Sequence, residues 1–136
     1  MSPVRGLALA MLCALTVAGC GGDNNLPTTP TTPLPSTSIF ASHVTVGGSA
    51  ARNFPSRSGT ITVRLRDTLA RTPLGLGLGL PYGGVSNCTL NTTVEATPST
   101  EPQISATVDA GSYCVVVYDL GTLTATTDFD VLIVYP

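Results

Sequence analysis

The sequence predicts an all-β protein: a single antiparallel β-sandwich, jelly-roll-like, with about eight short strands. Three observations support this prediction. From Ile39 onward, apolar and polar residues alternate with a period of two, which places them on opposite faces of strands. Residues that favour turns separate these runs at regular intervals. Outside the N-terminal segment, no stretch of helical length has apolar residues spaced as on a helix face.

The first strands are expected around residues 43–46 and 60–66, where valine, isoleucine and leucine alternate with threonine, histidine and arginine. Residues 74–80 alternate strictly between leucine and glycine. We favour a structural interpretation, in which the leucines enter the core and the glycines lie under bulky neighbours on the adjacent strand. Two alternatives stay open: a glycine face that a partner approaches closely, and a strand whose register slips.

The later strands are expected at residues 87–95, 104–108, 113–118 and 128–135. The segment 113–118 is almost continuously apolar, so it is predicted to be a central strand buried on both faces. A domain of about 100 residues is large enough for one hydrophobic core.

The N-terminal segment has the marks of a secretory signal. A positive residue, Arg5, precedes an apolar run over residues 7–18, which is shorter than the ~20 residues that a membrane-spanning helix needs. Residues 17–20 (Val-Ala-Gly-Cys) resemble the bacterial lipoprotein box. The resemblance implies that residues 1–19 are a signal peptide removed before Cys20, which then carries the lipid.

Residues 20–38 are predicted to be a disordered tether, because 26–38 consist largely of proline and threonine and prefer an extended polyproline conformation. The segment either lifts the domain 39–136 off a membrane or is a plain spacer. The glycine after Cys20 replaces the aspartate that lipoprotein rules associate with inner-membrane retention. The resemblance therefore implies the cell envelope, with the outer membrane favoured in a cell that has two membranes.

Charge narrows the classes of partner. Without residues 1–19 the chain has five arginines, no lysine and eight acidic residues, a net charge of −3. Nucleic-acid binding requires clustered basic residues, so it is excluded. Basic residues would not strengthen binding of the protein to anionic lipid either. Attachment to a membrane therefore depends on the acyl chains of the anchor.

Two cysteines remain in the domain. In an exported protein, Cys88 and Cys114 are predicted to form a disulfide. The alternative is a pair of buried free thiols. Zinc is not expected, because one histidine and two cysteines cannot complete its usual set of four ligands.

Three segments carry a second resemblance: residues 58–65 (Ser-Gly-Thr-Ile-Thr-Val-Arg-Leu), 110–118 (Ala-Gly-Ser-Tyr-Cys-Val-Val-Val-Tyr) and 128–134 (Asp-Phe-Asp-Val-Leu-Ile-Val). They resemble strands of bacterial pre-peptidase C-terminal domains, over roughly residues 40–136. The resemblance implies a jelly-roll-like sandwich that serves as an accessory domain of secreted enzymes. Some members bind calcium, but here glycines at 74–80 replace the acidic residues expected nearby.

Candidate functional residues are few. Asp119, Asp128 and Asp130 could supply oxygen ligands to calcium, or the acids could instead protect a strand edge. Tyr82, in a Pro-Tyr-Gly-Gly turn, is the aromatic residue expected to be exposed and to contact a ligand. No other cofactor is expected.

No catalytic motif is present in the sequence. His43 is the sole histidine, and no Gly-x-Ser-x-Gly segment accompanies it, which makes a hydrolase the weakest hypothesis. The prediction is therefore a non-enzymatic lipoprotein, anchored to a membrane by its lipid. Its sandwich is a binding or structural module, with a glycan-binding domain and an envelope assembly component as alternatives.

Overall fold

The computed structural model describes residues 29–84 and 87–136 and confirms the predicted sandwich of two antiparallel sheets. The chain divides after residue 31, and residues 29–31 of the first unit form neither helix nor strand. Every described strand belongs to the second unit, residues 32–136. The predicted lipid site Cys20 and the signal peptide 1–19 lie outside the described residues.

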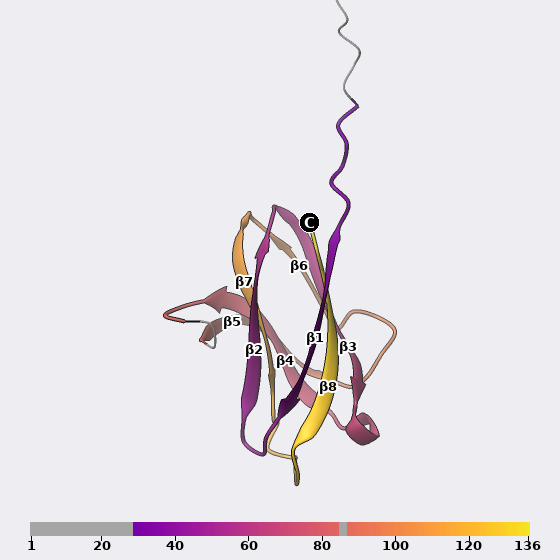
Figure 1. The fold of residues 1–136 in the computed structure, drawn as a ribbon, viewed down its shortest axis with the longest axis vertical. Helices are drawn as coiled ribbons and strands as arrows, with labels where there is room; N and C mark the ends of the chain where they lie inside the picture. The colour runs from indigo at the N-terminus through magenta and orange to yellow at the C-terminus, as the bar shows by residue number, and fades with distance from the viewer. Residues whose placement is uncertain (1–28, 85–86) are drawn as a thin grey trace, which may run out of the picture. The chain divides into compact units, whose positions relative to one another are not determined.

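Each sheet has four strands, and each neighbouring pair is antiparallel (Figure 1). The spatial order in the first sheet is β1 (Ser36–Val44), β8 (Thr127–Tyr135), β3 (Gly59–Thr68) and β6 (Ile104–Val108). The order in the second sheet is β2 (Ser49–Ser56), β7 (Gly111–Tyr118), β4 (Leu74–Pro81) and β5 (Cys88–Ala96). A single 3-10 turn, η1 (Leu69–Arg71), links β3 to β4 and so connects the two sheets.

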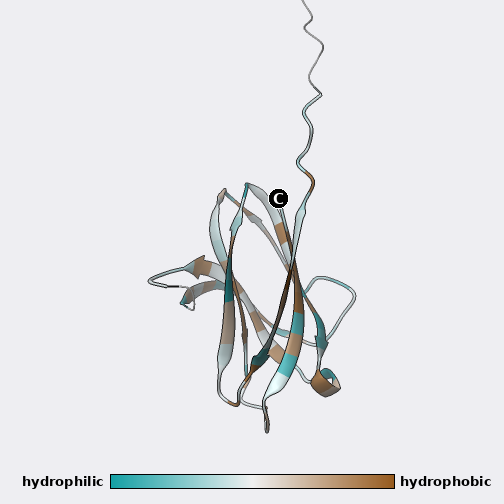
Figure 2. Ribbon diagram, viewed as in Figure 1, coloured by the Kyte–Doolittle hydropathy of each residue, from teal (hydrophilic) through white to brown (hydrophobic). Residues whose placement is uncertain are grey.

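The core lies between the two sheets because the alternating apolar residues of both face inward. Hydrophobic and hydrophilic residues alternate visibly along β8 (Figure 2). Phe40 and Phe129 meet edge to face, with ring centroids 5.0 Å apart. The largest side chains with no solvent exposure include Ile61, Leu65, Leu74, Leu76, Ile133 and Val131. Removal of this apolar surface from water is the main contribution to folding, at about 25 cal/mol per Å².

Strand β7 is central and buried on both faces, as predicted. It lies between β2 and β4, and the four residues Cys114 to Val117 are all buried. Two of them point into the core, whereas Cys114 and Val116 point to the outer face of the sheet. The continuous apolar run is therefore explained by cover on both sides of the strand.

Gly75 and Gly77 of β4 lie under bulky neighbours, which confirms the structural interpretation for the first part of the leucine–glycine repeat. The expectation for Leu80 was wrong: it follows the register shift between Leu78 and Gly79, and it is 46% exposed. Leu74, Leu76 and Leu78 enter the core, so the glycines between them face outward. The ring of Tyr118 on β7 occupies the space where Gly75 would carry a Cβ. Leu90 on β5 covers Gly77 in the same way, with its methyl carbons 2.8 Å from an ideal Cβ position. The missing side chains are thus replaced by those of the two neighbouring strands.

Cys88 and Cys114 form the predicted disulfide. It joins β5 to β7, which are both neighbours of β4 rather than of each other, with Cα atoms 6.0 Å apart. The bridge therefore spans β4 close to Gly79, which pairs with Cys114. An ideal Cβ at Gly79 would meet backbone atoms of Thr89 and Leu90 on β5, so β5 packs closely against β4 next to the bridge.

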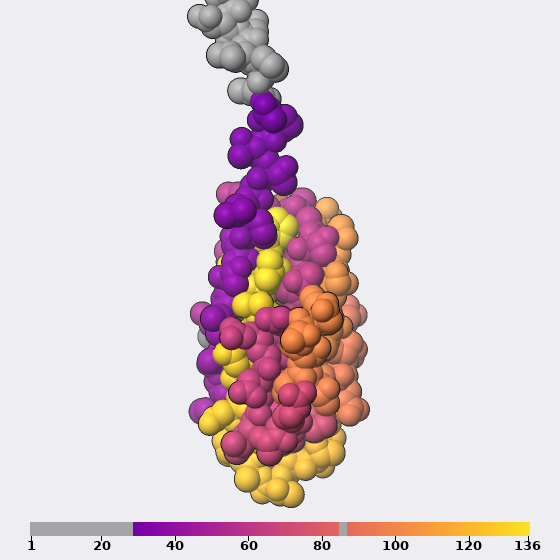
Figure 3. Space-filling view, turned by 90° about the vertical axis from the view of Figure 1, so that its right-hand side faces the viewer, coloured from indigo at the N-terminus to yellow at the C-terminus, as the bar shows by residue number. Residues whose placement is uncertain are grey.

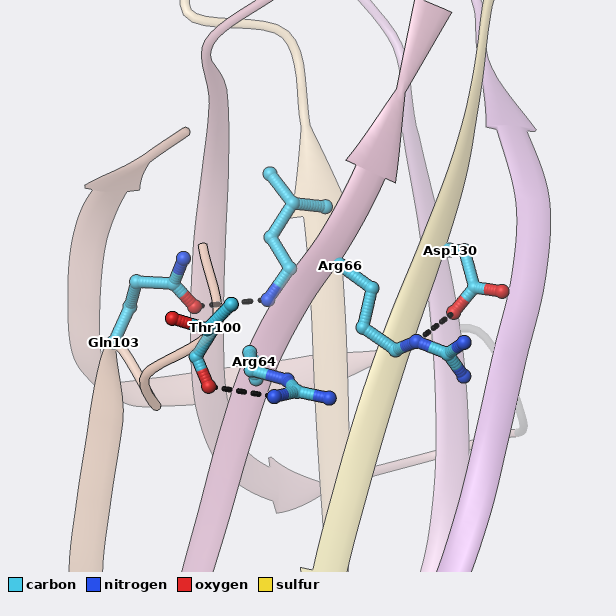
Figure 4. A network of polar contacts seen from close by, with 6 residues as sticks. Arg64, Arg66, Thr100, Gln103 and Asp130 are labelled. Carbon is cyan, nitrogen blue, oxygen red and sulfur yellow. Dashed lines mark hydrogen bonds and ion pairs between the residues drawn. The ribbon is translucent and has the colours of Figure 1, made fainter. Parts of the chain in front are cut away.

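A loop after β5 continues the first sheet beyond the short strand β6 (Figure 4). The backbone amides of Ser99 and Gln103 donate hydrogen bonds to carbonyls on β3, at 3.0 Å each. The side chain of Gln103 accepts a bond of 2.8 Å from the amide of Leu65, and Arg64 donates to the carbonyl of Thr100. Residues 97–103 thus satisfy the part of the β3 edge that β6 does not reach.

Two strand boundaries differ from the sequence-based expectation. β1 begins at Ser36, within the predicted tether, because residues 36–38 pair with the last residues of β8. It ends at Val44, so the expected strand positions 45 and 46 lie in the loop that follows. β2 runs over a segment, Ser-Ala-Ala-Arg-Asn-Phe-Pro-Ser, with no alternation of its own. It is a strand because its eight residues pair with β7, and its proline is tolerated because β2 is an edge strand.

Candidate binding surface at the distal end of the sandwich

Three loops meet at one end of the sandwich, which we call the distal end: residues 45–48, 69–73 and 119–126 (lower part of Figure 1). They meet because β1 and β3 end there while β8 begins there, with Val44 paired to Thr127. The opposite end contains Pro136 and residues 32–35, which border one hollow together. The distal end therefore faces away from the point where the N-terminal segment joins β1.

Asp119 holds two of these loops together. Its Oδ2 accepts a hydrogen bond of 2.8 Å from the amide of Gly47, and its own amide donates to the carbonyl of Gly48. Its Oδ1 accepts three more backbone hydrogen bonds, of 2.8–3.1 Å, from Gly121, Thr122 and Leu123. The bond from Gly47, followed by those from the 121–123 amides, lowers the pKa of Asp119 against the opposing effect of burial.

The third loop contains η1, whose backbone is unusual. Ala70 and Arg71 have φ angles of 54° and 55°, a left-handed conformation in two consecutive residues other than glycine. Each such residue costs about 1–2 kcal/mol relative to a right-handed one. Backbone strain of this kind persists only where the surrounding structure enforces it, and it is concentrated at functional sites.

Hydrogen bonds on both sides enforce the conformation of η1. The hydroxyl of Thr68 donates to the carbonyl of Thr72 at 2.9 Å, and the hydroxyl of Thr72 donates to the carbonyl of Leu69 at 2.8 Å. The guanidinium of Arg71 donates to the carbonyl of Pro98, also at 2.8 Å. The loop is therefore held in one shape, although its tip is in water.

That shape projects a leucine into solvent between two hollows. The side chain of Leu69 is 66% exposed, and Leu69 and Ala70 line both hollows. One hollow, of about 520 Å³, lies toward β8, and the other, of about 270 Å³, lies toward the threonine-rich loop 122–127. In the space-filling view, the gold residues of the loop after β7 form the tip of the domain (Figure 3). Val46, 57% exposed, is a second apolar residue at the distal end.

The larger hollow is lined by three acidic residues. Asp128 and Asp130 lie on the same outer face of β8, as their spacing predicts, and Asp67 comes from β3. Asp130 forms an ion pair with Arg66, with Oδ1 and Nε 3.7 Å apart (Figure 4). Asp67 was not among the residues expected here, because the irregular register of β3 after Leu65 brings it opposite Asp130.

The three calcium candidates do not come together as one site. Asp119 belongs to the loop that follows β7 in the chain, and its carboxylate already accepts hydrogen bonds from four backbone amides. In the described ranges 29–84 and 87–136, no group of three Asp, Glu, His or Cys side chains is arranged to hold a metal ion. The structure does not bring Asp119 together with Asp128 and Asp130, because the carboxylate of Asp119 accepts hydrogen bonds from Gly47 and from three amides of its own loop.

The two remaining sequence candidates lie in different places. Tyr82 is 60% exposed, as expected, and follows β4 at the end remote from η1, next to the half-exposed Leu80. Its amide donates to the carbonyl of Asn87 at 3.1 Å. His43 is exposed on β1, directly opposite Asp128 of β8. A ligand contact for Tyr82 stays a prediction.

The architecture defines the class of protein: an antiparallel β-sandwich of two four-stranded sheets. No protein-family model and no curated protein matches the sequence. The fold is similar to that of the Aeromonas hydrophila PliG, a periplasmic lysozyme inhibitor of g-type lysozyme, with 13% identity, a TM-score of 0.52, and coverage of 73% of this chain and 84% of that one. It is also similar to the Yersinia pseudotuberculosis-derived mitogen, with 14% identity, a TM-score of 0.56, and coverage of 76% and 88%. At these identities the similarity shows the fold alone.

Among the described residues, no helix has the length and apolarity to span a membrane.

Proposed function

We propose that this protein is an exported lipoprotein, anchored through Cys20, whose sandwich binds a protein partner with its distal end. The role is non-catalytic. The lipoprotein box supports the anchor, and the glycine after Cys20 favours the outer membrane in a cell with two membranes. A resemblance to pre-peptidase C-terminal domains, which are accessory domains, agrees with a binding role.

One observation supports the binding surface above all: Leu69 is exposed at the tip of a strained loop that hydrogen bonds hold in place. An exposed leucine on a rigid ridge, with a hollow on either side, suits the surface of a protein partner, because a partner that covers it removes apolar surface from water and the ridge needs no ordering on binding. The PliG of A. hydrophila, an inhibitor of g-type lysozyme, has a similar fold, which makes a g-type lysozyme a reasonable first partner to test.

We expect Leu69→Asp to weaken partner binding strongly, with little effect on folding, because Leu69 is largely exposed. A photo-crosslinking residue placed at position 69 of the full chain, in cells that produce it, should give a discrete adduct with one protein. Binding of that protein, and of a g-type lysozyme, is then measured by biolayer interferometry. Hot-spot residues contribute about 2 kcal/mol or more, so Leu69→Asp should weaken binding by at least about thirtyfold. Ile39→Asp is the matched control, because Ile39 is a half-exposed apolar residue on the face of the first sheet.

The same assay distinguishes the glycan-binding alternative. Purified peptidoglycan is the second probe, and Tyr82→Ala is the second variant. Saturable binding to peptidoglycan that Tyr82→Ala abolishes and Leu69→Asp leaves intact would support the alternative and contradict our proposal. Absence of any protein adduct from position 69, together with absence of lysozyme binding, would also contradict it.

Lipidation of Cys20 has its own test. Cells that produce the full chain should incorporate labelled palmitate into it, and Cys20→Ser should abolish the label and leave the precursor uncleaved. Cys13→Ser is the matched control and should label normally, since Cys13 lies within the predicted signal peptide. Normal labelling of the Cys20→Ser variant would refute the anchor without affecting the binding proposal.

A further inference from the structure

Strand β5 has an open backbone edge. It is the last strand of its sheet, and in the described part of the chain its backbone forms hydrogen bonds to β4 alone. It is nine residues long, and five of them are exposed: Thr89, Asn91, Thr92, Thr93 and Glu95. A long exposed edge of this kind is a template for another strand.

The other three edge strands carry features that hinder such pairing. On β1, the carbonyl of Ile39 already accepts a hydrogen bond of 2.6 Å from Arg52 of β2. β2 itself contains Pro55, which has no amide hydrogen to donate. β6 is only five residues long. Short strands, charges, prolines and bulges are the usual means of protecting edges, and β5 has neither proline nor a basic residue, although its pairing with β4 shifts register at Asn91.

The side chains of β5 suit pairing with an identical strand. Three threonines and an asparagine dominate the exposed positions, and Glu95 is the only charged residue of the strand. In an antiparallel self-pairing centred on Thr92, the middle residue of β5, Glu95 of one copy faces Thr89 of the other. No like charges then oppose each other, and threonine pairs across strands are favourable.

We propose that a second copy of this chain pairs with β5 in antiparallel orientation, forming a two-fold dimer. The four-stranded sheets that contain β5 in the two copies then join into one continuous sheet, and the open edge of β5 is paired in both copies. The same surface is used on both copies, so the assembly closes at two subunits. This inference is independent of the proposed partner at the distal end, since no loop of that end contributes to β5.

Analytical ultracentrifugation tests the dimer. The chain from residue 20, with Cys20→Ser to remove the free thiol, is measured from low to high micromolar concentrations, and its average mass should rise toward that of a dimer. Thr92→Lys alone and Thr92→Glu alone should each weaken association by at least tenfold, because each opposes like charges across the axis. An equimolar mixture of the two variants should associate again, because lysine then faces glutamate.

Thr107→Lys, an exposed position on β6, is the matched control and should dimerise as the parent does. Thermal unfolding at low concentration confirms that each variant is folded. A monomeric parent at every concentration would overturn the proposal. Equal weakening by Thr92→Lys and Thr107→Lys would overturn it too, as would failure of the Lys and Glu variants to associate when mixed.

Discussion

Replacement of both Cys88 and Cys114 by serine is expected to lower the free energy of unfolding by about 3.5 kcal/mol. The disulfide closes a loop with a sequence separation of 26, so it restricts the unfolded chain more than the folded one. In the folded state it ties the edge strand β5 to the central strand β7 across β4. Loss of the bridge therefore also removes a cross-link between the open edge strand and the centre of its sheet.

Urea unfolding of the chain from residue 20, carrying Cys20→Ser, measures this loss. Addition of a reductant to the parent should produce the same loss as the double substitution, and the reductant should not affect the double variant. These two comparisons separate the bridge from the side chains that replace it. Equal unfolding midpoints for parent and double variant would show that the bridge contributes nothing to stability.

Gly79→Ala is expected to destabilise the domain by roughly 3 kcal/mol or more, at the upper end of the cost of overpacking. A Cβ at this position would overlap the carbonyl oxygen of Thr89 and lie 2.8 Å from the Cα of Leu90. Both are backbone atoms of β5, so no side-chain rotation relieves the overlap. The β4–β5 ladder would have to open at the point where its register already shifts.

Gly111→Ala provides the matched control for this prediction. Gly111 also lies on a strand of the second sheet, and the nearest atom to its ideal Cβ is in the ring of Tyr113, at an ordinary 3.7 Å. Its substitution should change stability by less than about 0.5 kcal/mol. Urea unfolding of the two variants tests this difference, and the midpoint of Gly79→Ala should be much lower than that of Gly111→Ala. Similar midpoints would mean that β4 and β5 are not as closely packed as in the structure.

Local pattern was sufficient to predict most of the sandwich. Alternation over 60–66 and 104–108 corresponds closely to β3 and β6, because each of these strands has one face in the core and a more exposed face opposite it. Alternation over 74–80 corresponds to β4, in which leucines fill the core and glycines lie under side chains of the neighbouring strands. The continuous apolar run of β7 was equally informative, since only a central strand is covered on both sides. β2 was not predicted, because its pairing with β7, and not its own composition, makes it a strand.

The candidate site was much less predictable. Leu69 and its neighbours were not expected to matter, because no glycine or asparagine signals the left-handed turn at Ala70 and Arg71. Long-range hydrogen bonds impose that turn, notably from Arg71 to Pro98. The spacing of Asp128 and Asp130 predicted that both lie on one face of β8. The position of Asp67 next to them depends on a register shift in β3 that no sequence pattern indicates.

The amino-acid sequence by itself determined the all-β class and the burial of β7, because each depends on residue type and spacing along one strand. It also determined the disulfide, because Cys88 and Cys114 are the two cysteines of the domain. Tertiary structure alone decided which strands are neighbours, which edge stays open and how η1 presents Leu69. The physical reason is that these features arise from contacts between segments far apart in the chain. No local pattern of residues encodes the geometry of such contacts.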